Sequence, residues 1–422
     1  MKRFSMDGAH GGVTKRDNLL PDPNHLCMGG AFMRRVSDPA TGVGGARSVP
    51  LAEGALSPDG KNSGVGKCIT RRADPESERD RAAIERLWRD NLPYMVSSTA
   101  PARFEWLYRS NPDGPTLTWL AVDEQRGEVV GCASVLPRKV VVEGVSRSAG
   151  VAIDFAIDKP YRAFGVALRL QRAVAAQVWE SGMELVVAFP NDAAQGVIRR
   201  VGYRQIGQPW RGAQLLRSYP KLRQRRCSVP LAMVAGAGID LVLQLRNRIS
   251  LQSGKREGVH TLLLEEPDER WKRFWDKLKP RMGFGGSRDL DYLRWRYREC
   301  PLESYLFFCL FDSREELLGY LVFSRRDDVL HVCDIQSLEG RWMKPLLDRF
   351  WSEMRQAGVV AINAGLVGSQ AAIERFRQSG FVTRDGDGWG GVLTAPGIHV
   401  ELAGLLQQED RMWYLTEAEL DL

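Results

Sequence analysis

The residues best suited to hold a ligand lie between positions 153 and 168, where a predicted strand gives way to a predicted helix. The strand ends in Asp154, Phe155, Ala156 and Ile157, and the turn after it holds Arg162, Ala163, Phe164, Gly165, Val166 and Ala167. Backbone N–H groups at the start of a helix lack partners within it and lie at its positive end, which suits a pyrophosphate. Gly165 and Ala167 have no bulk to keep phosphates away, and Arg162 adds a bidentate donor. The alternative is an ordinary strand-to-helix connection with a surface arginine.

Apolar patterning predicts the elements that position this turn. Strands are expected at 69–72, 116–123, 128–142, 149–158 and 185–189, and helices at 77–90, 164–181 and 191–201. A hairpin turn at 124–127 joins two of the strands, and Gly202 ends the last helix. The order predicts an α/β domain with a mixed sheet, in which the turn follows the fourth strand.

The second half of the chain repeats landmarks of the first half in the same order. Trp106-x-Tyr108-x-x-x-Pro112 recurs as Trp295-x-Tyr297-x-x-x-Pro301, Asp123 and Gly131 recur as Asp312 and Gly319, Asp154-Phe155 recurs as Asp334-Ile335, and Gly202-Tyr203 recurs as Gly380-Phe381. Four landmarks in one order indicate a tandem duplication. The alternative is coincidence between two unrelated α/β domains. The aromatic stretches also carry arginines, a composition that suits sugars, although a helix with its aromatics in the core and its arginines in water is the preferred explanation.

The chain resembles the GNAT superfamily of acyl-CoA-dependent N-acetyltransferases over residues 69–210 and, more faintly, over 260–422. The family's pyrophosphate loop, Arg/Gln-x-x-Gly-x-Gly/Ala, matches Arg162-x-x-Gly165-x-Ala167, and its next helix matches Asn191, Ala194, Gly202 and Tyr203. The resemblance implies two GNAT-like domains in tandem and acetyl-CoA as co-substrate. It also implies that the fourth and fifth strands splay apart, that pantetheine pairs with the backbone of Phe155 to Ile157, and that Asn191 lies near it.

The resemblance raises the question of which groups move protons. Many relatives carry a tyrosine as general acid at the position of Ile198, so the donor here must lie elsewhere, with Tyr203 and Tyr161 as candidates. The acceptor amine must lose a proton, and Asp154 on the fourth strand is the predicted base; a surface carboxylate is the alternative. Cys132 has no histidine near it in sequence and is expected to be a buried, small side chain.

The second copy lacks the phosphate-binding residues. Its loop after Asp334 has no Gly-x-Gly or Gly-x-Ala, and Met343 and Pro345 fill the space that phosphates need. The position of Asn191 is taken by Ser369. Residues 259–422 are therefore predicted to form a degenerate GNAT-like domain that shapes the acceptor site or a dimer; an altered CoA-binding loop is the alternative.

Composition divides the rest of the 422-residue chain. Residues 1–68 contain neither Trp nor Tyr and are expected to be a disordered leader, followed by the CoA-binding domain at 69–215 and a basic and apolar connector at 216–258. The connector's stretch 217–245 could lie on an anionic membrane surface, although packing on a domain is preferred. Seven scattered cysteines without a C-x-x-C pair indicate a reducing, cytoplasmic setting without a metal centre. A net charge of +7 does not require a nucleic-acid partner.

The sequence thus predicts an acyl-CoA-dependent N-acyltransferase, which transfers acetyl to an amine. Tandem chains with this W-x-Y stretch resemble proteins of bacterial polysaccharide biosynthesis, which suggests an amino sugar of a polysaccharide precursor as acceptor. Two alternatives remain: a non-catalytic acyl-CoA sensor or assembly protein, and a FemAB-like aminoacyl transferase. The sequence leaves a homodimer open.

Overall fold

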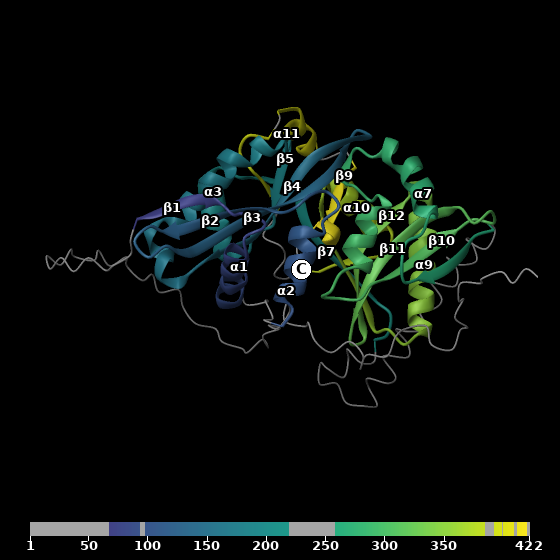
Figure 1. Ribbon diagram of the computed structural model, residues 1–422. Coiled ribbons are helices and arrows are strands. Elements are labelled where there is room, and N and C mark those ends of the chain that lie inside the picture. The colour runs from purple at the N-terminus through teal and green to yellow at the C-terminus, as the bar shows by residue number, and fades with distance from the viewer. Residues whose placement is uncertain are drawn as a thin grey trace, which may run out of the picture.

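The structure is a computed structural model. It describes residues 67–92, 98–218, 258–384, 392–398, 400–408 and 412–419. The predicted leader at 1–68 and connector at 216–258, including the stretch 217–245 considered for membrane contact, lie almost entirely outside the described residues. Figure 1 shows the purple-to-teal first half beside the green second half, with the yellow C-terminal segments between them.

The first sheet is mixed and is ordered β1-β2-β3-β4-β5-β15-β6, with β9 beside β3. Its strands are β1 (Cys68–Arg72), β2 (Leu117–Asp123), β3 (Glu128–Val142), β4 (Val145–Ile157), β5 (Leu185–Ala188), β6 (Arg204–Ile206), β9 (Phe284–Gly286) and β15 (Val392–Thr394). Its helices are α1 (Glu78–Asn91), α2 (Ala100–Phe104), η2 (Glu105–Arg109), η3 (Lys159–Phe164), α3 (Val166–Gln177), η4 (Val178–Ser181) and α4 (Asp192–Val201). Strands β1 to β4 are antiparallel, whereas β4 and β5 are parallel and joined through α3.

The second sheet has the corresponding order, β14-β7-β13-β12-β11-β10-β8, with β16 beside β13. Its strands are β7 (Gln208–Leu215), β8 (His260–Leu264), β10 (Leu306–Phe311), β11 (Leu317–Arg326), β12 (Val329–Ser337), β13 (Ala361–Gly368), β14 (Val382–Thr383) and β16 (Tyr414–Thr416). Its helices are α7 (Arg270–Leu278), η6 (Lys279–Arg281), α8 (Leu290–Leu293), η7 (Arg294–Arg298), α9 (Gly340–Gln356), α10 (Gln370–Gln378), α11 (Val400–Leu406) and η8 (Glu417–Glu419). The predicted α/β class with mixed sheets is confirmed, and the chain forms two of them.

The two sheets exchange one strand each. Strand β7 follows β6 in the chain but pairs with β13 and β14 of the second sheet, while β15 from the second half lies between β5 and β6 of the first. Gly207 makes the crossing with φ 60°, and a Cβ there would lie 2.5 Å from the ring of Trp413. Neither half therefore completes its sheet alone, and the sheets do not follow the sequence division at residue 215.

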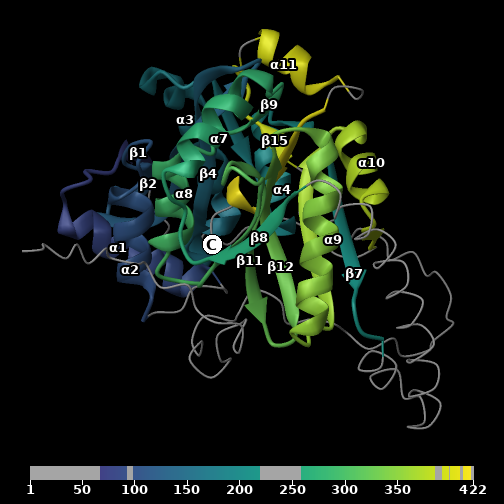
Figure 2. The ribbon, with the colours of Figure 1, turned by 90° about the vertical axis from the view of Figure 1, so that its right-hand side faces the viewer.

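Helices form three layers around the sheets. An apolar core joins α3 and α4 to one face of the first sheet, and a second core joins α9 and α10 to the outer face of the second sheet, as Figure 2 shows for α9. The inner faces share one core with α1, α2, η2, α7, α8 and η7. At its centre the rings of Trp106 and Trp295 stack 5.1 Å apart. Each indole N–H donates to the other residue's carbonyl, at 2.8 and 3.0 Å, so the aromatic stretches form the inter-half contact instead of presenting free faces to a sugar.

Candidate active site

The two central parallel strands of the first sheet separate before they end. Strands β4 and β5 pair from Ala149 with Leu185 to Ala152 with Ala188. Beyond this point Phe155, Ala156 and Ile157 continue β4: Ala156 and Ile157 pair with Cys132 and Gly131 of β3, and Phe155 lies in the register shift between the two strands. On their β5 side no strand among the described residues pairs with them. The backbone predicted to face pantetheine thus borders a groove between diverging strands.

The turn at the end of this groove begins an α-helix on a glycine. After η3, Gly165 adopts φ 69° and ψ 9°, and α3 starts at Val166. The left-handed region strongly favours glycine, so the turn depends on this residue. Gly165 is exposed, and the one atom within 4 Å of a Cβ built there is Nη1 of Arg169, at 3.7 Å. The position is therefore open enough for a phosphate to approach the first amides of α3.

Arg162 braces the turn. Its Nε donates to the carbonyl of Ile157 at 3.0 Å, and its Nη2 donates to Oδ1 of Asn91 at 3.0 Å. Asn91 donates in turn to Oδ1 of Asp158, and Oδ2 of Asp158 accepts a hydrogen bond from Nη1 of Arg86 at 3.0 Å. This network ties the end of β4 to α1. A contact between Arg162 and a pyrophosphate remains a prediction.

The other predicted cofactor residues take ordinary places in the fold. Val166 is buried, Ala167 is half-buried and Ala163 is exposed. Asn191 is the N-cap of α4, where its Oδ1 accepts from the amide of Ala194 at 3.0 Å. The cap orients the start of α4. A contact of Asn191 with pantetheine is still a prediction.

Asp154 lies at an irregularity in β4 and is held by two side chains that the sequence analysis did not identify. Its φ is 51°, and the register between β3 and β4 shifts at this point. Nη1 of Arg103 and the hydroxyl of Tyr108 both donate to Oδ2, each at 2.9 Å. Oδ1 is also buried, and no described residue hydrogen-bonds to it. The carboxylate is thus fixed through one oxygen and carries an unused acceptor on the other.

The alternative proton-transfer groups are engaged or buried. Tyr161 donates to Asp123 at 2.7 Å, and burial together with this carboxylate raises the pKa of its phenol to about 12. Tyr203 lies in the core between the first sheet and α3, where burial raises the pKa of its hydroxyl. Burial also raises the pKa of the Cys132 thiol. These placements favour packing roles, and the predicted proton donation by Tyr203 gains no support from its surroundings.

The equivalent groove of the second sheet is filled by the chain itself. Strands β12 and β13 stop pairing after Val332 and Ala364. Strand β16 then pairs with β13, and the Tyr414 hydroxyl donates to the carbonyl of Ile335 on β12, at 2.9 Å. Asp334, the counterpart of Asp154, accepts from Arg288 at 2.7 Å, from Tyr320 at 3.3 Å and from Thr416 at 3.2 Å.

At the helix start beside the second groove Gly340 is also exposed, but a guanidinium of the protein lies against it. A Cβ at Gly340, the first residue of α9, would overlap the guanidinium of Arg375 from α10. A cation of the protein therefore lies closer to this glycine than Arg169 lies to Gly165.

Among the described residues no group of three His, Cys, Asp or Glu side chains is arranged to hold a metal ion. No helix in the described part of the chain is long and apolar enough to cross a membrane.

Comparison with known proteins identifies the domain that carries the open groove. Residues 81–203 match the acetyltransferase (GNAT) family. No curated protein matches the sequence. The fold is similar to a probable N-acyltransferase from Enterococcus faecalis V583, with 11% identity, a TM-score of 0.55, and coverage of 78% of this chain and 72% of that one.

A GCN5-related N-acetyltransferase from Anabaena variabilis is similar to the same extent, with 14% identity, a TM-score of 0.53, and coverage of 77% of this chain and 72% of that one. At these identities the likeness establishes the fold, which extends over both halves. Residues 81–203 thus match a GNAT acetyltransferase domain, and this match together with the fold supports the predicted enzyme class, an N-acetyltransferase. Acyl-CoA is the donor used by this family.

Proposed function

We propose that the protein transfers an acyl group, acetyl in the first instance, from acyl-CoA in the groove of the first sheet to an amine. The separation of β4 and β5 after Ala152 and Ala188, beside the exposed turn at Gly165, is the observation that carries this proposal. The first amides of α3 would bind the pyrophosphate, because they lie at the positive end of a helix. The open backbone of Phe155 to Ile157 would pair with pantetheine.

Asp154 is our proposed base. Arg103 and Tyr108 hold Oδ2, which leaves Oδ1 to accept a proton from the attacking amine. The attack forms the amide bond and breaks the thioester bond, and the electron pair leaves on the CoA sulfur. Ile198 is buried in the position of the missing tyrosine, so the thiolate leaves with electrostatic stabilisation alone.

The proposed acceptor is an amino sugar of a polysaccharide precursor. This assignment rests on the resemblance in the sequence. The second half, whose own groove is filled, would shape the acceptor site because its inner core is continuous with that of the first half. A binding protein without turnover is the second candidate, since Asp154 forms an ion pair of a kind that recurs in the filled groove.

A charge placed at Gly165 tests the proposed function directly. We expect Gly165→Asp to weaken acetyl-CoA binding at least 100-fold in calorimetry, because a carboxylate would face the pyrophosphate and like charges cost several kcal/mol. Gly165→Asn is the matched control, since Asn has the same shape and also tolerates the left-handed region. Equal affinity in the Asp and Asn variants would place the pyrophosphate elsewhere. Release of free thiol with a panel of amino sugars then separates an enzyme from a binding protein.

A further inference from the structure

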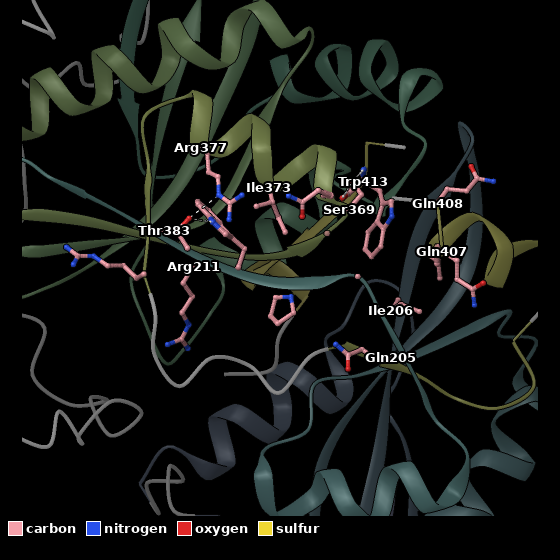
Figure 3. A pocket seen from close by; sticks show the side chains of 17 residues that line it. Gln205, Ile206, Arg211, Ser369, Ile373, Arg377, Thr383, Gln407, Gln408 and Trp413 are labelled. Atoms are coloured by element: carbon pink, nitrogen blue, oxygen red, sulfur yellow. Dashed lines mark hydrogen bonds between the residues drawn. The ribbon is translucent and has the colours of Figure 1, made fainter. Parts of the chain in front are cut away.

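A cavity of about 900 Å³ lies at the seam where the halves exchange strands. Figure 3 shows Arg211, Arg377 and Thr383 on one side of it and Gln407 and Gln408 on the other. The walls come from the β6–β7 crossing, α10, the end of α11 and the segment before β16. Its volume lies within the range of small-molecule sites. This cavity is separate from the groove between β4 and β5, since neither of those strands lines it.

The charge of the lining is one-sided. Three arginines, Arg211, Arg377 and Arg384, line the cavity, and its 17 lining residues include no Asp or Glu. In the described part of the chain neither Arg211 nor Arg384 forms an ion pair, whereas Arg377 lies 3.8 Å from Glu374 of its own helix. The remaining polar side chains include four glutamines, which can donate to oxygen atoms without adding charge.

The strand pairing places two of these arginines at opposite positions. Strands β7 and β14 pair at Thr383 with Gly212, and the amide of Arg384 donates to the carbonyl of Arg211 at 2.9 Å. Arg211 and Arg384 therefore lie opposite each other on neighbouring strands. Like charges in directly opposite positions destabilise a sheet, so this pairing weakens the fold unless an anion offsets it.

Thr383 fixes the third cation beside the other two. Its Oγ1 accepts from Nε of Arg377 at 3.1 Å and from the indole N–H of Trp210 at 3.0 Å. Because the hydroxyl oxygen accepts twice, its own hydrogen remains to donate to a further oxygen. The result is a fixed guanidinium beside a hydroxyl donor.

We infer that this cavity binds a small anion carrying two or more phosphate or carboxylate groups. Arginine pairs with both groups through two parallel hydrogen bonds, and three guanidinium groups around one cavity match several such groups. The inference goes beyond the proposed acyl transfer and does not depend on it.

The test is calorimetry of the full chain at low ionic strength with inorganic pyrophosphate and with citrate, which represent the phosphate and carboxylate sources. We expect anion binding that weakens as the salt concentration rises. The affinity should fall about tenfold or less in each single variant, Arg211→Gln, Arg377→Gln or Arg384→Gln, and at least 100-fold when the three changes are combined. Arg200→Gln, an exposed arginine of α4 outside the cavity, is the matched control. Gly165→Asp separates this binding from any binding at the α3 turn, and we expect it to leave the cavity's affinity unchanged.

Thermal unfolding without ligand shows whether the arginines serve the fold. Arg211→Gln should leave the Tm unchanged or raise it, because it relieves the repulsion from Arg384; a clear fall in Tm would contradict a ligand-binding role. The inference is overturned if neither anion binds the wild-type protein. It is also overturned if the triple variant binds with the wild-type affinity, or if Arg200→Gln weakens binding as much as the triple variant does.

Discussion

In both halves the central parallel strands stop pairing two residues before a buried aspartate: after Ala152 on β4 and after Val332 on β12. In both halves an arginine and a tyrosine donate to that aspartate. The halves differ in what enters the space between the strands. In the second half β16 pairs along β13, and Thr416 donates to Asp334. In the first half no described strand enters, and Oδ1 of Asp154 has no partner among the described residues.

The comparison separates what the fold requires from what a ligand requires. The ion pair of the aspartate occurs in both grooves, so its presence alone is no sign of catalysis. In the first half the Gly165 turn has no cation against its glycine position closer than Arg169, and the buried Oδ1 of Asp154 has no partner among the described residues. In the second half, by contrast, Arg375 lies against Gly340 and Thr416 donates to Asp334. A groove filled by the chain satisfies its polar groups internally, and an open one leaves them for a substrate. The two halves thus share the strand arrangement and the ion-paired aspartate, and they differ in the groups of the chain that occupy the space between the strands.

The largest expected effect comes from changing the two aspartates separately. Asp154→Asn should lower kcat about 100-fold or more if Oδ1 takes the proton of the amine. Asp334→Asn removes an equivalent carboxylate from a filled groove and should leave kcat near the wild-type value. Both variants leave a buried arginine without its charge partner and should lose stability, by about 3 kcal/mol.

The measurement is thiol release together with thermal unfolding of both variants. A similar fall of kcat in the two would show that kcat follows stability, and an unchanged kcat in Asp154→Asn would remove the proposed base. Either result would end the functional contrast between the two grooves.

Local patterns predicted the elements of the first half well. Helix α1, with Ser77 as its N-cap, lies within one residue of the predicted 77–90, and the hairpin of β2 and β3 has nearly the predicted bounds. Strand β4 begins at Val145, four residues before the predicted start, because β3 and β4 extend as one long hairpin toward β9 of the second half. That extension depends on a partner remote in sequence, which alternation along one strand cannot reveal.

The candidate site was predicted in part. The glycine turn could be located, because Arg162-x-x-Gly165-x-Ala167 lies within one short segment between a predicted strand and a predicted helix. The partners of Asp154 could not, since Arg103 and Tyr108 reach it from α2 and η2 across the inner core. The exchange of β7 and β15 was also missed, because each strand would satisfy the pattern of either sheet. The repeated W-x-Y stretch was the available signal, and its meaning is the contact of the two halves.

A second, smaller effect concerns the segment that fills the second groove. Glu419 forms an ion pair with Arg288 at 2.5 Å and lies 3.7 Å from Arg138 of β3. Although burial opposes ionisation, these arginines hold the pKa of Glu419 below its ordinary value. A carboxylate with a lowered pKa stabilises the fold above its unfolded pKa, about 4.3, and the contribution is lost as the pH falls through the folded pKa.

We therefore expect Glu419→Gln to lower stability at pH 7 by about 3 kcal/mol and to approach the wild type as the pH falls below about 4. Thermal unfolding across this pH range measures both. A difference that stays constant with pH would show that Glu419 acts through shape and not through charge. Acetyl-CoA affinity should not change, because the segment fills the other groove.

The smallest effect tests whether the halves act as equals at their contact. Trp106→Phe and Trp295→Phe each remove one indole donor to a buried carbonyl, and each should cost about 1 to 3 kcal/mol. Because the stacked rings and reciprocal hydrogen bonds form one contact, the double variant should lose less than the sum of the single losses. A double-mutant cycle in urea measures this coupling. Strict additivity would mean that the two tryptophans stabilise their own halves independently, and a large inequality between the single variants would show that one half supports the contact more than the other.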